Sequence, residues 1–131
     1  MDILGVRVDD VTYNEALERC ASLIASGGRG YVVTPNPEFV ILARRDDEFR
    51  GILNRADLCI PDGGGLLLAA RLFGRPLREQ VRGTDLCYGL IDRAPAAGWR
   101  IFFLGAAPSV AEAAAAALTR RTPGLQIAGT F

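Results

Sequence analysis

Short, solid apolar runs alternate along this chain with segments whose apolar residues recur at helical spacing. The runs are rich in β-branched or aromatic residues, which is typical of buried strands. The segments between them have an apolar face with a period of 3.6 residues. This alternation predicts an α/β fold, with a mostly parallel sheet and helices on both faces. The expected strands are Ile3–Val8 (as a strand or part of a hairpin), Gly30–Thr34, Leu58–Ile60, Arg100–Leu104 and Leu125–Ala128.

Capping signals predict where several of the helices begin. A side-chain oxygen at an N-cap accepts a hydrogen bond from a free N–H of the first turn. The predicted caps are Thr12 (with Glu15 completing a capping box), Asn36 (followed by Pro37) and Thr84, whose helix should run to about Ala97. Asp46 should restart the helix that Asn36 begins, giving a second helix to about Arg55.

The size and charge of the chain exclude several classes of protein. Its 131 residues fit a single domain, 1–131, with its own core. Fifteen basic residues balance fifteen acidic ones, so no overall basic field favours nucleic acid as a partner. There is no histidine, which excludes a histidine base, a Ser-His-Asp triad and histidine-ligated zinc. We expect neither a signal peptide nor a membrane-spanning segment, because the first residues lack a basic region and a long apolar run, and no apolar stretch approaches the roughly 20 residues that a bilayer requires.

Two groups of reactive residues are assigned structural roles. The three cysteines, Cys20, Cys59 and Cys87, are far apart and stand beside apolar residues, which predicts buried free thiols in a reducing compartment. The acidic clusters Asp9-Asp10 and 46–48 fall at predicted turns or helix starts, and we interpret them as surface charge.

Ligands of open α/β sheets bind outside the carboxyl ends of the strands. The end that follows the second expected strand reads Thr34-Pro35-Asn36-Pro37-Glu38 and offers a hydroxyl, an amide and a helix N-terminus. The same residues also suit an ordinary turn with an asparagine cap. The end after Leu104, with Gly105 and Pro108, could seat a phosphate on a helix N-terminus or be a plain turn.

The stretch Pro61-Asp62-Gly63-Gly64-Gly65 places one carboxylate between an apolar strand and a glycine turn. Asp62 could cap the next helix, stand beside a phosphate loop, or act as a general base. Three successive glycines are more than a cap needs, and they suggest a backbone that a ligand approaches closely. They match neither a Walker A loop nor a dinucleotide fingerprint.

Two arginines, Arg78 and Arg82, stand beside the cap expected at Thr84 or Asp85. Arginine forks match phosphate geometry, so this segment is either a phosphate contact or a solvated loop.

Five blocks, taken in order, resemble the WecB/TagA/CpsF family of bacterial glycosyltransferases. They are "ILGVRVDDVTYNEAL", "VVTPNPEF", "ADLCIPDGGGLLLAARLFG", "EQVRGTDL" and "IFFLGAAPSVAEAAAAAL". The resemblance covers nearly the whole chain and implies a Rossmann-like fold. It implies inverting transfer of an N-acetylmannosamine-type sugar from a UDP donor to a polyprenyl-diphosphate-linked amino sugar, in wall teichoic acid, enterobacterial common antigen or exopolysaccharide synthesis. It also implies catalysis without a metal or other cofactor.

The resemblance assigns roles to particular residues. It implies that Asp62 is the catalytic base and that Thr34 and Asn36 lie in the active site. The leaving diphosphate would need helix N-termini and arginines to stabilise its charge. We therefore expect substrate contacts at Gly63, Gly64, Arg82, Asp85, Gly105 and Pro108.

The family continues well past the position of Phe131. We expect a basic, amphipathic C-terminal region beyond it that completes the active site and docks on the cytoplasmic membrane face, making the protein peripheral there. The alternative is a truncated, non-catalytic nucleotide-sugar-binding or assembly module. The exposed last strand makes a homo-oligomer, formed through an open sheet edge, a further candidate. A dehydrogenase is disfavoured because no strand is followed by Gly-x-Gly-x-x-Gly.

Overall fold

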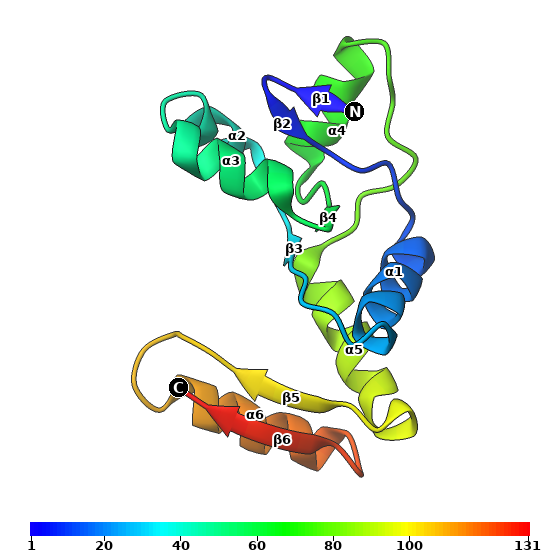
Figure 1. Ribbon diagram of the computed structural model, residues 1–131, viewed down its shortest axis with the longest axis vertical. Helices are drawn as coiled ribbons and strands as arrows, with labels where there is room; N and C mark the ends of the chain where they lie inside the picture. The colour runs from blue at the N-terminus through cyan, green and yellow to red at the C-terminus, as the bar shows by residue number, and fades with distance from the viewer. The chain divides into compact units, whose positions relative to one another are not determined.

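The computed structural model describes residues 1–131 as two compact units, Met1–Leu86 and Cys87–Phe131 (Figure 1). The first unit contains two small sheets and four complete helices. Its elements are β1 (Asp2–Ile3), β2 (Val6–Arg7), α1 (Tyr13–Ala25), β3 (Val32–Val33), α2 (Pro37–Ala43), α3 (Asp47–Arg55), β4 (Leu58–Cys59) and α4 (Gly64–Leu72).

The two sheets of the first unit differ in direction. Strands β1 and β2 form an antiparallel hairpin, and its turn is closed by a 2.9 Å hydrogen bond from the Gly5 N–H to Asp2 Oδ1. Strands β3 and β4 pair in parallel, with Val32 opposite Leu58. A parallel pair needs a crossover between its strands, which here consists of α2 and α3.

The helix starts predicted at Thr12, Asn36 and Asp46 are confirmed. Thr12 and Glu15 form a reciprocal capping box at the start of α1. Asn36 Oδ1 accepts from the N–H of Phe39 at 2.9 Å, and Asp46 Oδ1 accepts from the N–H of Phe49 at 2.8 Å. These bonds satisfy backbone donors that would otherwise lack a partner, so each helix start is fixed by its local sequence.

An apolar core holds the first unit together. Cys59 is fully buried, and burial is the main reason why the pKa of its thiol is raised to about 12. The thiol therefore stays protonated and packs as a small apolar group. The buried members of this cluster are Ile3, Val6, Val8, Val40, Ala43, Leu53, Cys59, Leu66, Ala70 and Leu77.

Helix α5 (Gly83–Ala97) begins in the first unit and continues into the second, which adds β5 (Arg100–Phe103), α6 (Val110–Arg121) and β6 (Gln126–Thr130). Strands β5 and β6 pair in parallel, and Figure 1 shows α6, which connects them, running alongside the pair. Their register shifts between Ile101 and Phe102. The core of this unit contains Ile91, Ala94 and Leu125, with Trp99, Ile101, Phe103, Leu118 and Ile127 packed against it.

The predicted α/β, Rossmann-like class with parallel strand pairs is confirmed. The strands form three two-stranded sheets, of which β3–β4 and β5–β6 are parallel and β1–β2 is antiparallel. Cys20 and Cys59 are buried as predicted, but the prediction for Cys87 is wrong, since that residue is exposed. No helix has both the length and the apolar character needed to cross a bilayer. The single-domain prediction stays a prediction.

Candidate active site

The turn after β3 and the turn after β4 lie side by side. Hydrogen bonding between the two segments continues beyond the paired residues, from the Ile60 N–H to the Val33 carbonyl at 2.8 Å and from the Asp62 N–H to the Pro35 carbonyl at 2.9 Å. The parallel pairing therefore carries Thr34 and Asp62 to the same edge, the carboxyl end of the two strands. This is the edge where α/β sheets bind ligands.

Asp62 does cap a helix, although not the one that follows it. Helix α4 begins at Gly64 without a side-chain cap. The carboxylate of Asp62 instead accepts a 3.1 Å hydrogen bond at Oδ2 from the N–H of Gly83, the first residue of α5. The prediction that Thr84 caps α5 is wrong, because the helix already begins at Gly83 and its first N–H is satisfied by a residue of a different segment.

The Thr34 side chain also packs against Gly83 at the start of α5. A Cβ placed on Gly83 would lie 3.0 Å from Thr34 Cγ2 and 3.2 Å from Thr34 Oγ1. Only glycine admits so close an approach without displacing one of the segments. Thr34, Asp62 and the N-terminus of α5 thus converge in the first unit.

The three glycines after Asp62 differ in why the structure has a glycine at that position. Gly63 adopts φ +96°, a left-handed conformation that side chains disfavour. A Cβ on Gly65 would meet Pro37 Cγ at 2.6 Å, so its glycine is required by packing against the neighbouring turn. Gly64 alone of the three has nothing within 4 Å of an added Cβ. The space beside Gly64 is therefore open, while Gly63 and Gly65 shape the turn. The substrate contacts expected at Gly63 and Gly64 stay predictions.

The other residues predicted for this site lie around it in the first unit. The side-chain oxygen Oδ1 of Asn36 is occupied as the cap of α2, where it accepts from the Phe39 N–H. Arg82 is exposed, and its carbonyl accepts the first backbone hydrogen bond of α5, from Leu86 at 3.0 Å. Asp85 is exposed in the first turn, where its backbone carbonyl accepts a 3.3 Å hydrogen bond from the Tyr13 hydroxyl. The substrate contacts expected of these residues stay predictions.

Gly105 and Pro108 lie in the second unit, in the loop between β5 and α6. The loop contains three left-handed residues, Gly105, Ala106 and Ser109, and it is tied to the strand end by a 2.6 Å hydrogen bond from the Gly105 N–H to the Phe131 carbonyl. Ser109 makes no side-chain cap for α6. The phosphate contact expected here also stays a prediction.

Two features near the site were missed by reasoning from the sequence. Asp9 and Asp10 are not free surface charges: Asp9 binds the N–H of Cys59 and Arg7, while Asp10 binds Arg78. Arg78 is held in ion pairs with Asp10 and Glu15, so it is not the unpaired phosphate ligand that its segment suggested. The signal available in the sequence was that the aspartates stand between two apolar residues, Val8 and Val11.

The surface beside the glycine turn is hollowed. A shallow groove runs along α2 and is lined by Pro37, Glu38, Ile41, Leu42 and Arg45. Its first residue, Pro37, is the one that packs against Gly63 and Gly65. No group of three or more acidic, cysteine or histidine side chains gathers in a way that could hold a metal ion.

Known proteins with similar sequences are glycosyltransferases. The chain is 36% identical over 99 residues to an N-acetylglucosaminyldiphosphoundecaprenol N-acetyl-beta-D-mannosaminyltransferase of Bacillus spizizenii, a match that covers 76% of the chain and 38% of that protein. It is 31% identical over 130 residues to a protein of the same name from Staphylococcus aureus, covering 98% of the chain and 51% of the relative. The chain therefore spans about half the length or less of these relatives.

The family assignment rests on the whole chain. A single family model matches residues 1–131 without a break, and it includes the turns that carry Thr34, Asp62 and Gly83. The chain therefore belongs to the WecG/TagA/CpsF family of glycosyl transferases.

Proposed function

We propose that this chain is the catalytic core of an inverting glycosyltransferase. The donor is a UDP-activated N-acetylmannosamine-type sugar, and the acceptor is a polyprenyl-diphosphate-linked amino sugar used in cell-surface polysaccharide synthesis. The convergence of Thr34, Asp62 and the α5 N-terminus at one edge of a parallel strand pair carries this proposal. Family membership supplies the class of reaction, and the names of the relatives support the sugar and the lipid-linked acceptor.

Asp62 is the proposed general base. Its Oδ2 atom is held by the Gly83 N–H, which leaves Oδ1 for the hydroxyl of the acceptor. As Asp62 takes the hydroxyl proton, the acceptor oxygen forms a bond to the anomeric carbon and the bond from that carbon to UDP breaks. One displacement of this kind inverts the anomeric centre and requires no nucleophile from the protein. Thr34, beside the same corner, would hydrogen-bond the reacting sugar.

The start of α5 is the proposed contact for the leaving diphosphate. The Gly83 N–H is occupied by Asp62, but the remaining N–H groups of the first helical turn and the helix dipole favour an anion at this position. Arg82, exposed at that helix start, adds a guanidinium that can bind two phosphate oxygens. Stabilisation of the charge that builds up on a leaving group is often the largest single contribution to catalysis.

The exposed face of α4 is consistent with the proposal that the acceptor stays in a membrane. Leu68, Leu72 and Phe73 are 60%, 78% and 57% exposed. Arg71 and Arg75 are exposed beside them, and no acidic residue occurs between positions 63 and 78. An apolar face bordered by arginines is complementary to an anionic bilayer surface. We propose that this α4 face, together with the C-terminal region expected from the family, makes the protein peripheral to the membrane.

Transfer is tested with purified protein, both as this chain and as the complete product of the reading frame that encodes it. UDP release is measured with UDP-N-acetylmannosamine and an acceptor analogue that carries N-acetylglucosamine on a lipid diphosphate. We expect UDP release from the complete product only when both substrates are present, and product analysis should show an inverted anomeric centre. Release that does not depend on the acceptor, or transfer with retention, would contradict the proposal.

A further inference from the structure

Two adjacent aspartates bind two different segments of the first unit. Asp9 pairs with Cys59 of β4 through two bonds, from its N–H to the Cys59 carbonyl at 2.8 Å and from the Cys59 N–H to Asp9 Oδ2 at 2.9 Å. Asp10 binds Arg78, accepting from its backbone N–H at 2.9 Å and from its Nε at 3.3 Å. One short stretch of chain therefore connects β4 to the segment that precedes α5.

These two anchors stand close in sequence to the two residues that meet at the site. Cys59 is followed three residues later by Asp62, and Arg78 is followed five residues later by Gly83. Both segments are restrained between anchor and site. Asp62 is also bonded to the Pro35 carbonyl, and in the other segment Val81 is buried and Glu79 accepts from Tyr13. The separation between Asp9–Asp10 and each anchor thus bears directly on the 3.1 Å contact between Asp62 and Gly83.

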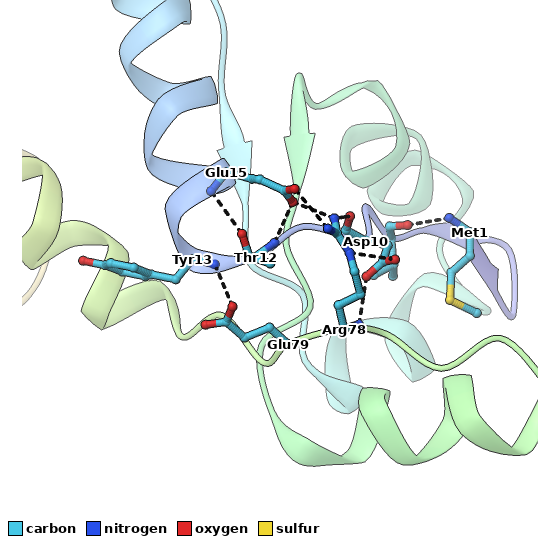
Figure 2. A network of polar contacts seen from close by, with 8 residues as sticks. Met1, Asp10, Thr12, Tyr13, Glu15, Arg78 and Glu79 are labelled. Carbon is cyan, nitrogen blue, oxygen red and sulfur yellow. Dashed lines mark hydrogen bonds and ion pairs between the residues drawn. The ribbon is translucent and has the colours of Figure 1, made fainter.

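The Arg78 guanidinium donates hydrogen bonds to both Asp10 and Glu15 (Figure 2). Its Nη1 and Nη2 atoms donate to the two carboxylate oxygens of Glu15 at 3.0 and 2.6 Å, and Nη2 also donates to the Asp10 carbonyl at 2.7 Å. Glu15 is itself fixed, because it closes the capping box with Thr12. The neighbouring Glu79 accepts from the N–H of Tyr13 at 3.2 Å. A bidentate pair of this kind fixes direction as well as distance.

We propose that Asp10 and Arg78 are positioning residues of the active site, which hold the start of α5 against the Asp62 carboxylate. This inference rests on the proposed function in one respect, the role of Asp62 as the base. Neither residue touches the substrate. Each acts through the Gly83 N–H, which stops the carboxylate from rotating and keeps Oδ1 available to the acceptor hydroxyl. A reacting group displaced by about 1 Å can lose about 10²-fold in rate, so a remote clamp of this kind matters to turnover.

The local effect is measured by NMR on this chain, without substrate. We expect Asp10→Ala and Arg78→Gln to shift the Gly83 amide resonance and to speed its hydrogen exchange by about five-fold or more, as loss of one hydrogen bond implies. Amides of α3 and of the second unit should keep their exchange rates. Asp92→Ala is the matched control, because it removes an exposed aspartate from an arginine pair with Arg121 in the second unit.

The effect on turnover is measured in the complete product. Asp10→Ala and Arg78→Gln should lower kcat by roughly ten-fold to a hundred-fold with little change in KM for the donor. Arg78→Lys, which keeps the charge but not the fork, should fall between wild type and Arg78→Gln. If Asp10→Ala fails to fold, Asp10→Asn removes the charge while keeping the shape of the side chain.

The outcomes separate this inference from the proposed function. A Gly83 amide that is unchanged in folded Asp10 and Arg78 variants overturns the positioning role, and so does a kcat equal to that of wild type. If the Gly83 amide shifts in the Asp10 and Arg78 variants while the wild-type complete product shows no transferase activity, the clamp is supported and the proposed function alone is contradicted.

Discussion

Asp62 and Gly83 are 21 residues apart in sequence, and the carboxylate of the first accepts a 3.1 Å hydrogen bond from the backbone N–H of the second. A residue at the end of one strand thus caps a helix that begins in another segment. The bond gives Asp62 a structural role in addition to the proposed chemical one, and the two roles can be separated by substitution.

Asp62→Asn and Asp62→Ala should therefore differ. Asparagine keeps an oxygen that can accept from Gly83, so this variant should fold normally and bind UDP, yet turn over about 10²-fold or more slowly for lack of a base. Alanine removes the cap as well and should lower the free energy of unfolding by about 0.5–2 kcal/mol. UDP release, UDP binding by calorimetry and urea unfolding measure the three effects. Full activity of Asp62→Asn would disprove the base assignment.

Gly83 and Gly64 should respond in opposite ways to alanine. At Gly83 the new Cβ would press on Thr34, so we expect a loss of about 1–3 kcal/mol in the free energy of unfolding. At Gly64 the space is empty, and alanine in the first turn of α4 should be neutral or stabilise by about 0.5–1 kcal/mol. Urea unfolding of both variants is the measurement. If Gly64 gives clearance to a substrate, Gly64→Ala should also raise KM, and an unchanged KM would remove that residue from the site.

Glu15 should make stability depend on pH. Hydrogen bonds from Arg78 are the main cause that lowers the pKa of Glu15 below its usual value of 4.5. A carboxylate with a lowered folded pKa stabilises the protein fully above pH 4.5, and the effect disappears as the pH falls through the folded pKa. Glu15→Gln can still form the capping box but cannot ionise.

Thermal unfolding of Glu15→Gln and wild type between about pH 3 and pH 7 tests this expectation. The Tm difference between them should be full and constant above pH 4.5 and should shrink as the pH falls through the lowered folded pKa of Glu15. Glu38→Gln, which removes an acidic residue from the first turn of α2, is the control. A Tm difference that is constant with pH would show that the charge of Glu15 contributes nothing.

The α4 face should bind anionic lipid. We expect the chain to float with phosphatidylglycerol vesicles more than with phosphatidylcholine vesicles, because arginines border the apolar residues. Leu68→Ser combined with Leu72→Ser should reduce binding to both kinds of vesicle, whereas Arg71→Gln with Arg75→Gln should remove the preference for anionic lipid. Ile24→Ser, at an exposed apolar residue of α1, is the control. Variants that bind like wild type but lose self-association would assign the face to a second copy.

The parts of the structure that the sequence predicted are those fixed by neighbours in the chain. Thr12 with Glu15, and Asn36 with Pro37, lie within one helical turn of the groups they serve, so their spacing indicates the cap. The apolar runs likewise identified the strands that pair in parallel.

The parts that escaped prediction depend on residues distant in sequence. Arg78 meets Asp10 across 68 positions, and nothing in either local pattern identifies the other. The same is true of Gly83, whose first N–H is satisfied by Asp62 while Thr84 looked like the local cap. Asp62 itself was identified by its place after a strand and by the resemblance to a family, but its partner could be found only in the folded chain.

The tight contact between Gly65 and Pro37 also constrains how such a chain can diverge. A side chain at position 65 cannot be accepted while the proline ring stands 2.6 Å from its Cβ. The two positions are therefore coupled: a side chain at position 65 requires an earlier or simultaneous change at position 37. Substitution at Gly65 alone would disturb the packing against Pro37, even if the new side chain improved contact with a substrate. The turn beside Asp62 should thus vary by paired replacements or not at all.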